Sequence, residues 1–575
     1  MNPVTPWAWS MISAAMEITG RLPEIVIRPE AETRIFLVAA LLAASFFTGC
    51  SSSDSGGTTA TDPSTPDTTV PAPAPPSPPT AVNVLTYHND NARTGQNLQE
   101  TLLTPANVNG TTFGKLFSYP VDGSVYAQPL YATNVRIAGQ LHNVVFVATE
   151  HNSVYAFDAD NKTSVPLWRT SFIDPVNGIT TVPSRDTNCD DINPEIGITS
   201  TPVIDSVTGI LYVVAMTKEN GAYAHRLHAL DIATGNEKFG TGMKLQASVP
   251  GTAAPNDGKG RLVFNSLLEN QRAALLLSNN VLYIATGSFC DLGNHHGWVL
   301  TYDSKTLNLL GAFSSTPNGN EGGIWQSGGG AAADANGSIY LITGDGSFDA
   351  ASGGSNYGNT FLKLSGAALT VADYFTPFNQ ATLAAVNGDL GSGGALLLPD
   401  QSAGPAHLLV SAGKQGTIYL LNRDNMGKFQ AANDSQIVQS LPRPYPLFGT
   451  PAYFKNTVYM AAAGDRLNAY VLSNGQLSLS KQSTSIFGWP GATAVISANG
   501  STDGIVWALE TNGSGAPAVL HAYSAADVSI ELYNSNQNSG RDYPGPAIKF
   551  SVPTVANGKV YVGSQYQVSV FGLLP

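Results

Sequence analysis

From about residue 82 onward, the chain repeats a unit of two short strands joined by a loop. Apolar and polar residues alternate with a period of two in these segments, and β-branched and aromatic residues are frequent, which predicts strands rather than helices. Eight first strands can be counted, at 144–149, 210–215, 281–286, 338–343, 407–411, 457–462, 504–509 and 559–563. Their second strands lie at 154–158, 226–231, 298–303, 360–364, 417–421, 466–471, 518–523 and 567–571. We expect each pair to form a hairpin.

The spacing of these hairpins predicts the fold. The centres Phe146 and Tyr561 lie seven intervals apart, which gives about 59 residues per repeat. A repeat of this length made only of strands is typical of a propeller blade. Short apolar stretches ahead of the first strands, such as 200–205 and 449–454, supply the innermost strand of each blade. We therefore predict an all-β, eight-bladed β-propeller over residues 82–575.

The last repeat ends at Phe571 without a fourth strand. The apolar stretch 113–119 precedes the first repeat and belongs to no hairpin. We predict that this N-terminal strand completes the eighth blade and closes the ring, because closure leaves no unpaired sheet edge.

Composition narrows the class of protein. The net charge is −13 and only 12% of residues are charged, so a basic face for a nucleic-acid backbone is not expected. The chain contains 58 Gly and 36 Pro, which is unfavourable for long helices and suits many turns.

The first 50 residues have the features of a signal peptide with a lipobox. An uncharged run at 35–49 is too short to span a bilayer and ends at Cys50. Phe47-Thr-Gly-Cys50 resembles a bacterial lipobox, which implies lipid on the Cys50 thiol. The alternative is an ordinary cleaved signal. Acidic residues oppose the arginines of the first 34 residues, so we expect the signal to begin nearer Arg34 than Met1.

Residues 51–81 are rich in Pro, Ser and Thr and are predicted to be a disordered tether. A tether after a lipid anchor holds a domain away from a membrane. The expected location is therefore the cell envelope, at an outer membrane or the cell surface, with the lipid as the only membrane contact.

The remaining cysteines, Cys189 and Cys290, are predicted to form a disulfide. Both lie in loops that open on the same propeller face, and an exported protein matures where thiols oxidise. The alternative is two isolated thiols. Cys290, His295 and His296 lack a fourth ligand for a structural zinc ion, so no metal site is predicted.

A family resemblance rests on the segment from Ala229 to Phe239. Ala229-Leu-Asp231-Ile-Ala-Thr234-Gly235-Asn-Glu-Lys-Phe239 resembles the blade-docking motif of pyrroloquinoline-quinone-like propeller repeats, with Phe in place of Trp. Ala156-Phe-Asp158, followed by Thr163 and Trp168, is a looser copy. The resemblance implies the propeller fold. The family includes quinoprotein alcohol dehydrogenases and also cofactor-free relatives, such as the lipoprotein that helps to assemble outer-membrane barrels.

A quinone cofactor needs Ca²⁺ held by oxygen ligands, an Asp base and a flat surface on each side of the quinone. In the dehydrogenases one surface is a disulfide between adjacent cysteines, and this chain has no Cys-Cys pair. We therefore expect no cofactor, with pyrroloquinoline quinone plus calcium as the alternative.

Functional residues are expected in the loops around the mouth of the central channel. These loops are long here and carry carboxylates, imidazoles, cations and aromatic rings. The ligand-binding candidates are Asp190, Glu195, His296, Trp325, Asp345, Lys414, Trp489 and Arg541. The mixture suits a sugar or a peptide segment, and the alternative is that the loops are only solvated. No catalytic residue is assigned.

The favoured function is a lipid-anchored binding or scaffold module for a glycan, a peptide or a cell-envelope protein, and not an enzyme. One alternative is a quinone-dependent oxidoreductase acting on alcohols or sugars. A second is a carbohydrate-active propeller that uses paired carboxylates such as Glu195 and Asp345.

Overall fold

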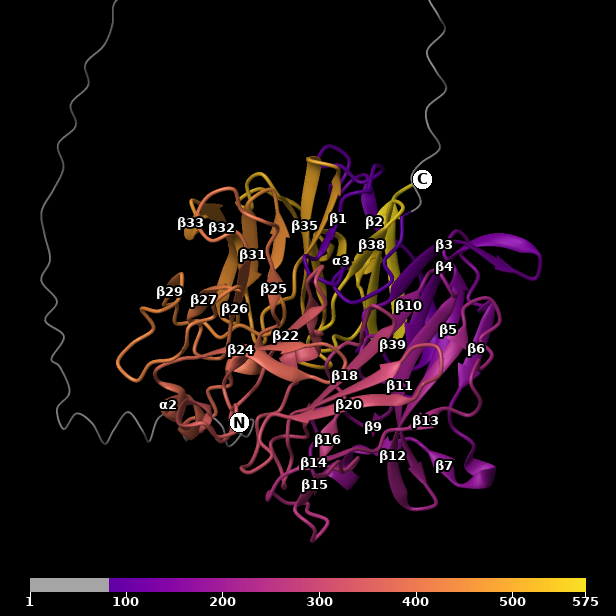
Figure 1. Cartoon of the computed structure of the whole chain (residues 1–575). Coiled ribbons are helices and arrows are strands. Elements are labelled where there is room, and N and C mark those ends of the chain that lie inside the picture. Colours follow the sequence, from indigo (N-terminus) through magenta and orange to yellow (C-terminus); the bar gives the residue numbers. More distant parts are fainter. Residues whose placement is uncertain (1–81) are drawn as a thin grey trace, which may run out of the picture. The chain divides into compact units, whose positions relative to one another are not determined.

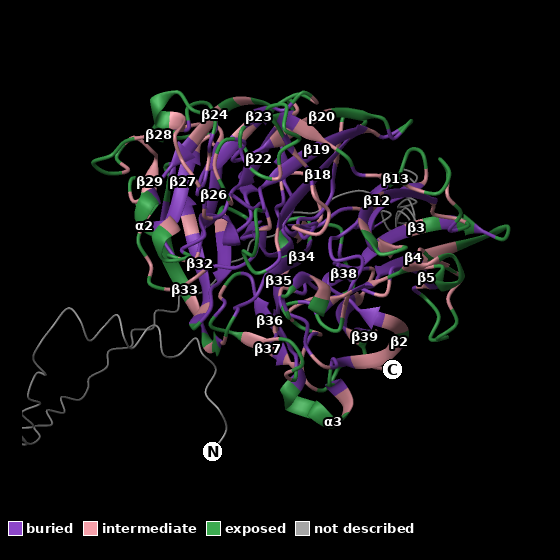
Figure 2. Ribbon diagram, turned by 90° about the horizontal axis from the view of Figure 1, so that it is seen from below, coloured by how far each residue is buried: buried purple, intermediate pink, exposed green. Residues whose placement is uncertain are grey.

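A computed structural model describes residues 82–575 of the chain. The predicted signal peptide, tether and Cys50 lie outside the described residues. Within residues 82–575 the α-helices are two short segments, α2 (Gln380–Ala385) and α3 (Ser539–Asp542), and no helix is long and apolar enough to cross a membrane. The all-β prediction is confirmed. Eight antiparallel blades are arranged around a central axis (Figures 1 and 2).

Seven blades are built from consecutive strands, ordered from the channel outward. Blades 1 to 4 are β3 (Leu130–Ile137), β4 (Gln140–Ala148), β5 (Ser153–Asp158) and β6 (Trp168–Ser171); β10 (Val203–Asp205), β11 (Ile210–Glu219), β12 (Ala222–Asp231) and β13 (Met243–Lys244); β17 (Leu276–Ser278), β18 (Val281–Ser288), β19 (Trp298–Asp303) and β20 (Leu309–Ser314); β21 (Ala332–Ala333), β22 (Ser338–Ile342), β23 (Phe361–Ser365) and β24 (Thr370–Thr376). Blades 5 to 7 are β25 (Leu396–Leu397), β26 (Leu408–Ala412), β27 (Ile418–Asn422) and β29 (Gln439–Leu441); β30 (Ala452–Phe454), β31 (Thr457–Ala461), β32 (Asp465–Ser473) and β33 (Gln476–Phe487); β34 (Val495–Asn499), β35 (Thr502–Glu510), β36 (Val519–Ser524) and β37 (Glu531–Asn534).

Short strands extend some blades or decorate the loops. They are β1 (Gln96–Asn97) beside β34, β7 (Ile179–Thr180) beside β11, β16 (Glu269–Asn270) beside β18, β28 (Lys428–Phe429) beside β24, and the pairs β8 (Val182–Pro183) with β9 (Glu195–Ile196) and β14 (Ser248–Pro250) with β15 (Arg261–Val263).

The eighth blade joins the two ends of the described chain. It consists of β38 (Thr554–Ala556), β39 (Lys559–Leu573) and β2 (Phe113–Ser124), and β2 runs antiparallel to β39 with Phe117 opposite Val570. Figure 1 shows the indigo β2 beside the yellow C-terminal strands. The first part of β39 pairs with β38 and the last part with β2, on either side of Tyr566, which has φ of 60°. The predicted closure of the ring by the N-terminal strand is confirmed.

Hydrophobic clusters fill the spaces between neighbouring blades, and Figure 2 shows buried residues running through each blade. The repeat motif acts at one of these interfaces. Trp168 of blade 1 donates its Nε1–H to the carbonyl oxygen of Ile232 at 2.9 Å, and Thr170 Oγ1 donates to Gly235 O at 2.6 Å. Gly235 has φ of 71°, and a Cβ there would lie 2.6 Å from the indole ring of Trp168. Phe239, which replaces Trp in the motif, is 41% exposed.

Residues 84–97, here called the clasp, run once around the inside of the channel. Backbone and asparagine side-chain groups of the clasp form a hydrogen bond of 2.7 to 2.9 Å with the innermost strand of every blade. The bonded residues of blades 1 to 8 are, in order, Tyr131, Ile204, Leu277, Ala333, Leu397, Tyr453, Ile496 and Val555. His88 and Arg93 of the clasp are fully buried. The clasp therefore fills the channel and forms the floor beneath its mouth.

Candidate functional site

Four aromatic residues meet at the mouth of the channel and form a cluster that we call the platform: Trp325, Phe448, Trp489 and Phe550. Each stands in a link between two blades, shortly before an inner strand. Phe448 is the common neighbour, with ring centroids 6.3 Å from Trp325, 6.1 Å from Trp489 and 5.9 Å from Phe550. Such distances lie in the range in which aromatic rings attract one another.

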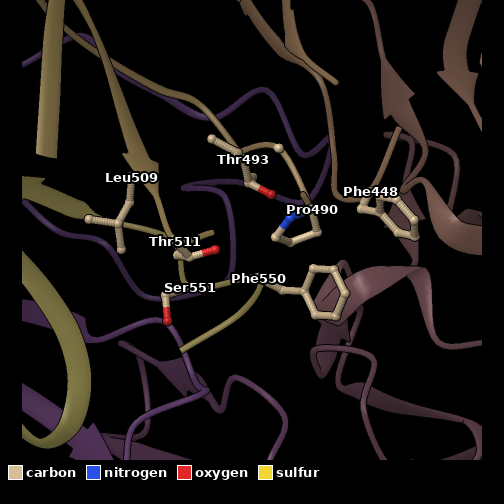
Figure 3. A pocket seen from close by; sticks show the side chains of 9 residues that line it. Phe448, Pro490, Thr493, Leu509, Thr511, Phe550 and Ser551 are labelled. Carbon is tan, nitrogen blue, oxygen red and sulfur yellow. The ribbon is translucent and has the colours of Figure 1, made fainter. Parts of the chain in front are cut away.

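The platform is buried on its inner side and open on its outer side. Phe448 is buried, whereas Trp489 is 51% exposed. Figure 3 shows Phe448, Pro490 and Phe550 around a small pocket beneath the platform, with Thr493, Thr511 and Ser551 also lining it. An aromatic ring that is half-exposed and supported by other rings offers a flat apolar surface to a ligand.

The backbone at Phe550 is strained. Its φ is 68°, in the left-handed region that a bulky side chain rarely adopts. Strain of this kind costs about 1–3 kcal/mol and is found frequently at ligand sites, where the surrounding structure enforces it. The conformation directs Phe550 into the platform.

Three cations surround the rings. Lys549 Nζ lies 5.7 Å from the ring centroids of both Trp489 and Phe550, and Lys414 Nζ lies 5.8 Å from that of Trp325. Arg272 Cζ lies 5.5 Å from the ring of Phe550. Contacts of this type add a modest attraction to the platform.

Two of these cations are neutralised by carboxylates. Lys549 Nζ lies 2.7 Å from Asp191 Oδ1, and Lys414 Nζ lies 2.6 Å from Asp389 Oδ2. Burial lowers the pKa of Lys549, and the charge of Asp191 opposes this effect. Arg272 is buried, and its Nη2 has no hydrogen-bond partner among the described residues.

Burial also changes the protonation of carboxyl groups near the mouth. It raises the pKa of Asp345 to about 7, and the charge of neighbouring Asp389 raises it further. Asn359 Nδ2 donates to Asp345 Oδ1 at 2.7 Å, whereas Oδ2 is buried without a partner. Burial raises the pKa of Glu150 to about 7, although Gly197 N donates to its Oε2 at 2.7 Å. Both carboxyl groups therefore titrate near neutral pH.

The predicted disulfide between Cys189 and Cys290 is confirmed, with Cα atoms 5.7 Å apart. It ties the link after blade 1 to a loop of blade 3, next to the Asp191 carboxylate. Because Asp191 holds Lys549, the disulfide supports one side of the platform. The bonded sulfur atoms are not available as thiolates, so this group does not make a metal site.

The structure brings four of the eight candidates together at the mouth: Trp325, Asp345, Lys414 and Trp489. Asp190 is exposed. Glu195 binds His151 Nδ1 at 2.9 Å and accepts from Thr181 Oγ1 at 2.7 Å.

Two other candidates are fully engaged in structural contacts. His296 uses both ring nitrogens, with Thr316 Oγ1 at 2.8 Å and Ala254 O at 2.9 Å. Arg541 lies at the outer edge between blades 7 and 8, where it donates to Phe113 O at 3.2 Å and pairs with Asp542.

Sequence reasoning missed Arg272, Phe448, Lys549 and Phe550. All four stand in links a few residues ahead of an inner strand, as Trp325 and Trp489 do. This shared position was the signal that identifies them, because such links converge on the channel axis.

The mouth does not fit a quinone with its calcium ion. Phe448 and Phe550 contact each other and Trp325, so the described rings leave no flat slot in which a second planar group could stack. The pocket beneath the platform contains about 190 Å³, part of it open to solvent, whereas ligand pockets usually contain about 300 Å³ or more. The disulfide joins two separate loops, and Asp389 is occupied by Lys414.

No protein-family model matches the chain, and no curated protein matches it. Solved structures share its fold. A quinohemoprotein alcohol dehydrogenase from Comamonas testosteroni has 15% identity and a TM-score of 0.55, over 85% of this chain and 80% of that chain. A europium-containing methanol dehydrogenase has 13% identity and a TM-score of 0.55, over 86% and 98%. A quinohemoprotein alcohol dehydrogenase from Pseudomonas putida HK5 has 14% identity and a TM-score of 0.53, over 85% and 80%. These likenesses confirm the propeller fold that the repeat motif implies.

Proposed function

We propose that this protein is a non-enzymatic recognition module of the cell envelope that binds a polar organic ligand at the mouth of its propeller. The platform of Trp325, Phe448, Trp489 and Phe550 carries this proposal. It presents the half-exposed ring of Trp489 at the centre of the long-loop face, with cations and hydrogen-bonding groups around it. Binding sites of this kind combine an apolar surface with a few polar groups that set orientation.

The proposal excludes a redox cofactor. The dehydrogenases named above are quinoproteins or contain a metal according to their descriptions, and fold alone does not carry that chemistry to this chain. The contacts between Phe448, Phe550 and Trp325 support a cofactor-free mouth, because these rings fill the place where a planar cofactor would stack.

The location is part of the proposal. A lipid on Cys50 and the Pro-rich segment 51–81 would hold the propeller at an outer membrane or the cell surface. The partner would then be a glycan, a peptide or a cell-envelope protein. A net charge of −13 argues against nucleic acid.

The test measures binding of the full chain to immobilised oligosaccharides and peptides, with Trp489→Ala as the variant and Phe239→Ala as the control. Phe239 is also exposed but lies in the blade-2 motif turn, away from the platform. We expect the wild type and Phe239→Ala to bind the same ligand, and Trp489→Ala to lose at least about tenfold in affinity.

Equal binding by Trp489→Ala would contradict a role for the platform. A stoichiometric complex with pyrroloquinoline quinone and Ca²⁺ that reduces a dye in the presence of an alcohol would overturn the non-enzymatic assignment. Mass spectrometry of the mature protein tests the anchor, since an unmodified peptide spanning Gly49 to Ser51 would exclude the lipid.

A further inference from the structure

A crevice opens between blades 5 and 6, beside the platform. Side chains and backbone of the link between these blades form one wall, and the hairpin of β31 and β32 forms the other. The crevice contains about 250 Å³, part of it open to solvent. Its polar lining residues are Arg443, Tyr445, Asp465, Asn468 and Tyr470.

The polar groups of the crevice leave both donors and acceptors available. Arg443 Nη2 lies 3.1 Å from Asp465 Oδ2, and Asn468 Nδ2 donates to the same oxygen at 2.8 Å. The hydrogen bonds that Asp465 receives from these side chains end on Oδ2, which leaves Oδ1 for another donor. Arg443 Nε is buried and has no partner among the described residues. A buried donor without a partner is costly, and a ligand that accepts from it would remove that cost.

The crevice and the platform share a wall. Leu447 lines the crevice, and the next residue, Phe448, belongs to the platform. On the other side, Gly491 of the pocket beneath the platform packs against the backbone of Ala461 and Ala462, and Ala462 lines the crevice. A ligand longer than one unit can therefore contact both.

Charge selects the class of ligand. The cations Lys549, Lys414 and Arg443 each have a carboxylate partner, at 2.7, 2.6 and 3.1 Å respectively. An acidic chain would meet those carboxylates and a basic chain would meet the cations, so a neutral ligand is favoured. A hydroxyl group both donates and accepts, which matches a guanidinium beside a carboxylate. The apolar face of a sugar ring matches an exposed indole.

We infer that the crevice is a second subsite of the same binding site, and that the ligand is a neutral oligosaccharide of at least two units. One sugar ring stacks on Trp489, and hydroxyl groups of a neighbouring unit bind Arg443 and Asp465. This inference rests on the proposed function of the platform and adds to it the chemical class and the minimum length of the ligand.

The test uses linear neutral gluco-, manno- and galacto-oligosaccharides of one to six units, measured against the full chain by array and then by calorimetry. The variants are Trp489→Ala, Arg443→Gln and Arg443→Lys, and the control is Arg136→Gln, an exposed arginine of β3. Arg443→Lys keeps the charge beside Asp465 but removes the Nε donor. Thermal unfolding of each variant establishes that it is folded.

We expect affinity to rise with chain length beyond one unit in the wild type and in Arg136→Gln. Both Arg443 variants should lose about tenfold in affinity for the longer oligosaccharides and bind the shortest ones as the wild type does. Trp489→Ala should weaken binding at every length.

Unchanged binding of the longer oligosaccharides by both Arg443 variants would overturn the second subsite. Binding of a peptide but of no oligosaccharide, lost in Trp489→Ala, would overturn the ligand class and leave the proposed function standing. Binding of neither kind of ligand would overturn both.

Discussion

Arg93 Nε donates a hydrogen bond of 3.0 Å to the carbonyl oxygen of Ala331, so the clasp reaches the fourth blade with a charged side chain. The same guanidinium donates to Thr86 Oγ1 and Tyr87 O at 2.8 Å and to Leu275 O at 3.3 Å. It is fully buried, and burial lowers the pKa of Arg93 to about 10. One side chain therefore links the clasp to itself and to blades 3 and 4.

Replacing Arg93 by Met is expected to lower the free energy of unfolding by at least about 3 kcal/mol, because several buried oxygens lose their donor together. Urea unfolding at pH 7 measures this loss. Arg136→Gln, on an exposed arginine, is the matched control and should change stability by less than about 0.5 kcal/mol. A loss below about 1 kcal/mol in Arg93→Met would show that the clasp contributes little.

Removing the disulfide with Cys189→Ser and Cys290→Ser together is expected to destabilise the propeller by about 2–4 kcal/mol, since the bridge closes a long loop in the unfolded chain. The separation of the two cysteines is 101 residues. Thermal unfolding of the double variant, and of reduced wild type as a second measurement, should give the same shift in Tm. Identical Tm values with and without the bridge would contradict this expectation.

His521 makes stability depend on pH. It is buried in blade 7, with Nδ1 2.7 Å from Glu531 Oε1 and Nε2 3.2 Å from Glu510 Oε2. Burial lowers the pKa of His521, but the hydrogen bonds and charges of the two carboxylates outweigh it, and the pKa is raised. A raised pKa in the folded state gives stability that is present below about pH 6.5 and is lost as the pH rises through the folded value.

We therefore expect the Tm of the wild type to fall as the pH rises from about 6 to 9, and the Tm of His521→Gln to fall less over the same interval. Differential scanning calorimetry at four or more pH values compares the two slopes. His407→Gln is the control, because His407 is exposed. Equal slopes in wild type and His521→Gln would exclude this role.

Asp345 acts with the same sign for a different reason. Its pKa is raised from 3.8 to about 7 by burial and by the charge of Asp389. An ionised carboxylate is thus disfavoured in the folded protein, and stability falls as the pH rises from about 4 through 7. Asp345→Asn should raise the Tm at pH 8 relative to the wild type and change it less at pH 5. A lower Tm at pH 8 would mean that the ionised group is stabilised by its surroundings.

The sequence predicted the blades because each hairpin carries its own alternating pattern, and it predicted the closing strand because the repeat ending at Phe571 lacked a partner. The clasp had no comparable signal: residues 84–97 contain no repeated hydrophobic pattern, and their hydrogen bonds go to residues far along the chain. Their role follows from the ring, which the sequence describes only one blade at a time.

The site was predictable in part for the same reason. Trp325 and Trp489 stood out as large aromatic residues in long links, whereas Phe448 and Phe550 are isolated phenylalanines whose meeting depends on how four links converge. Arg541 was expected at the mouth, but its link leaves the outermost strand of blade 7, which lies close to the start of β2. Position within a loop does not specify which end of the blade the side chain reaches.

The pairing of β2 with β39 also sets the time at which this protein finishes folding. Phe117 waits for Val570, which leaves the ribosome more than 400 residues later, and at ordinary synthesis rates this delay is roughly 20 to 90 seconds. During that interval β2 has an unpaired edge, the kind of surface that templates aggregation. Chains truncated before β39 should therefore accumulate as aggregates, and chaperones that shield the nascent N-terminal segment should matter more to the yield than those that act on the finished protein.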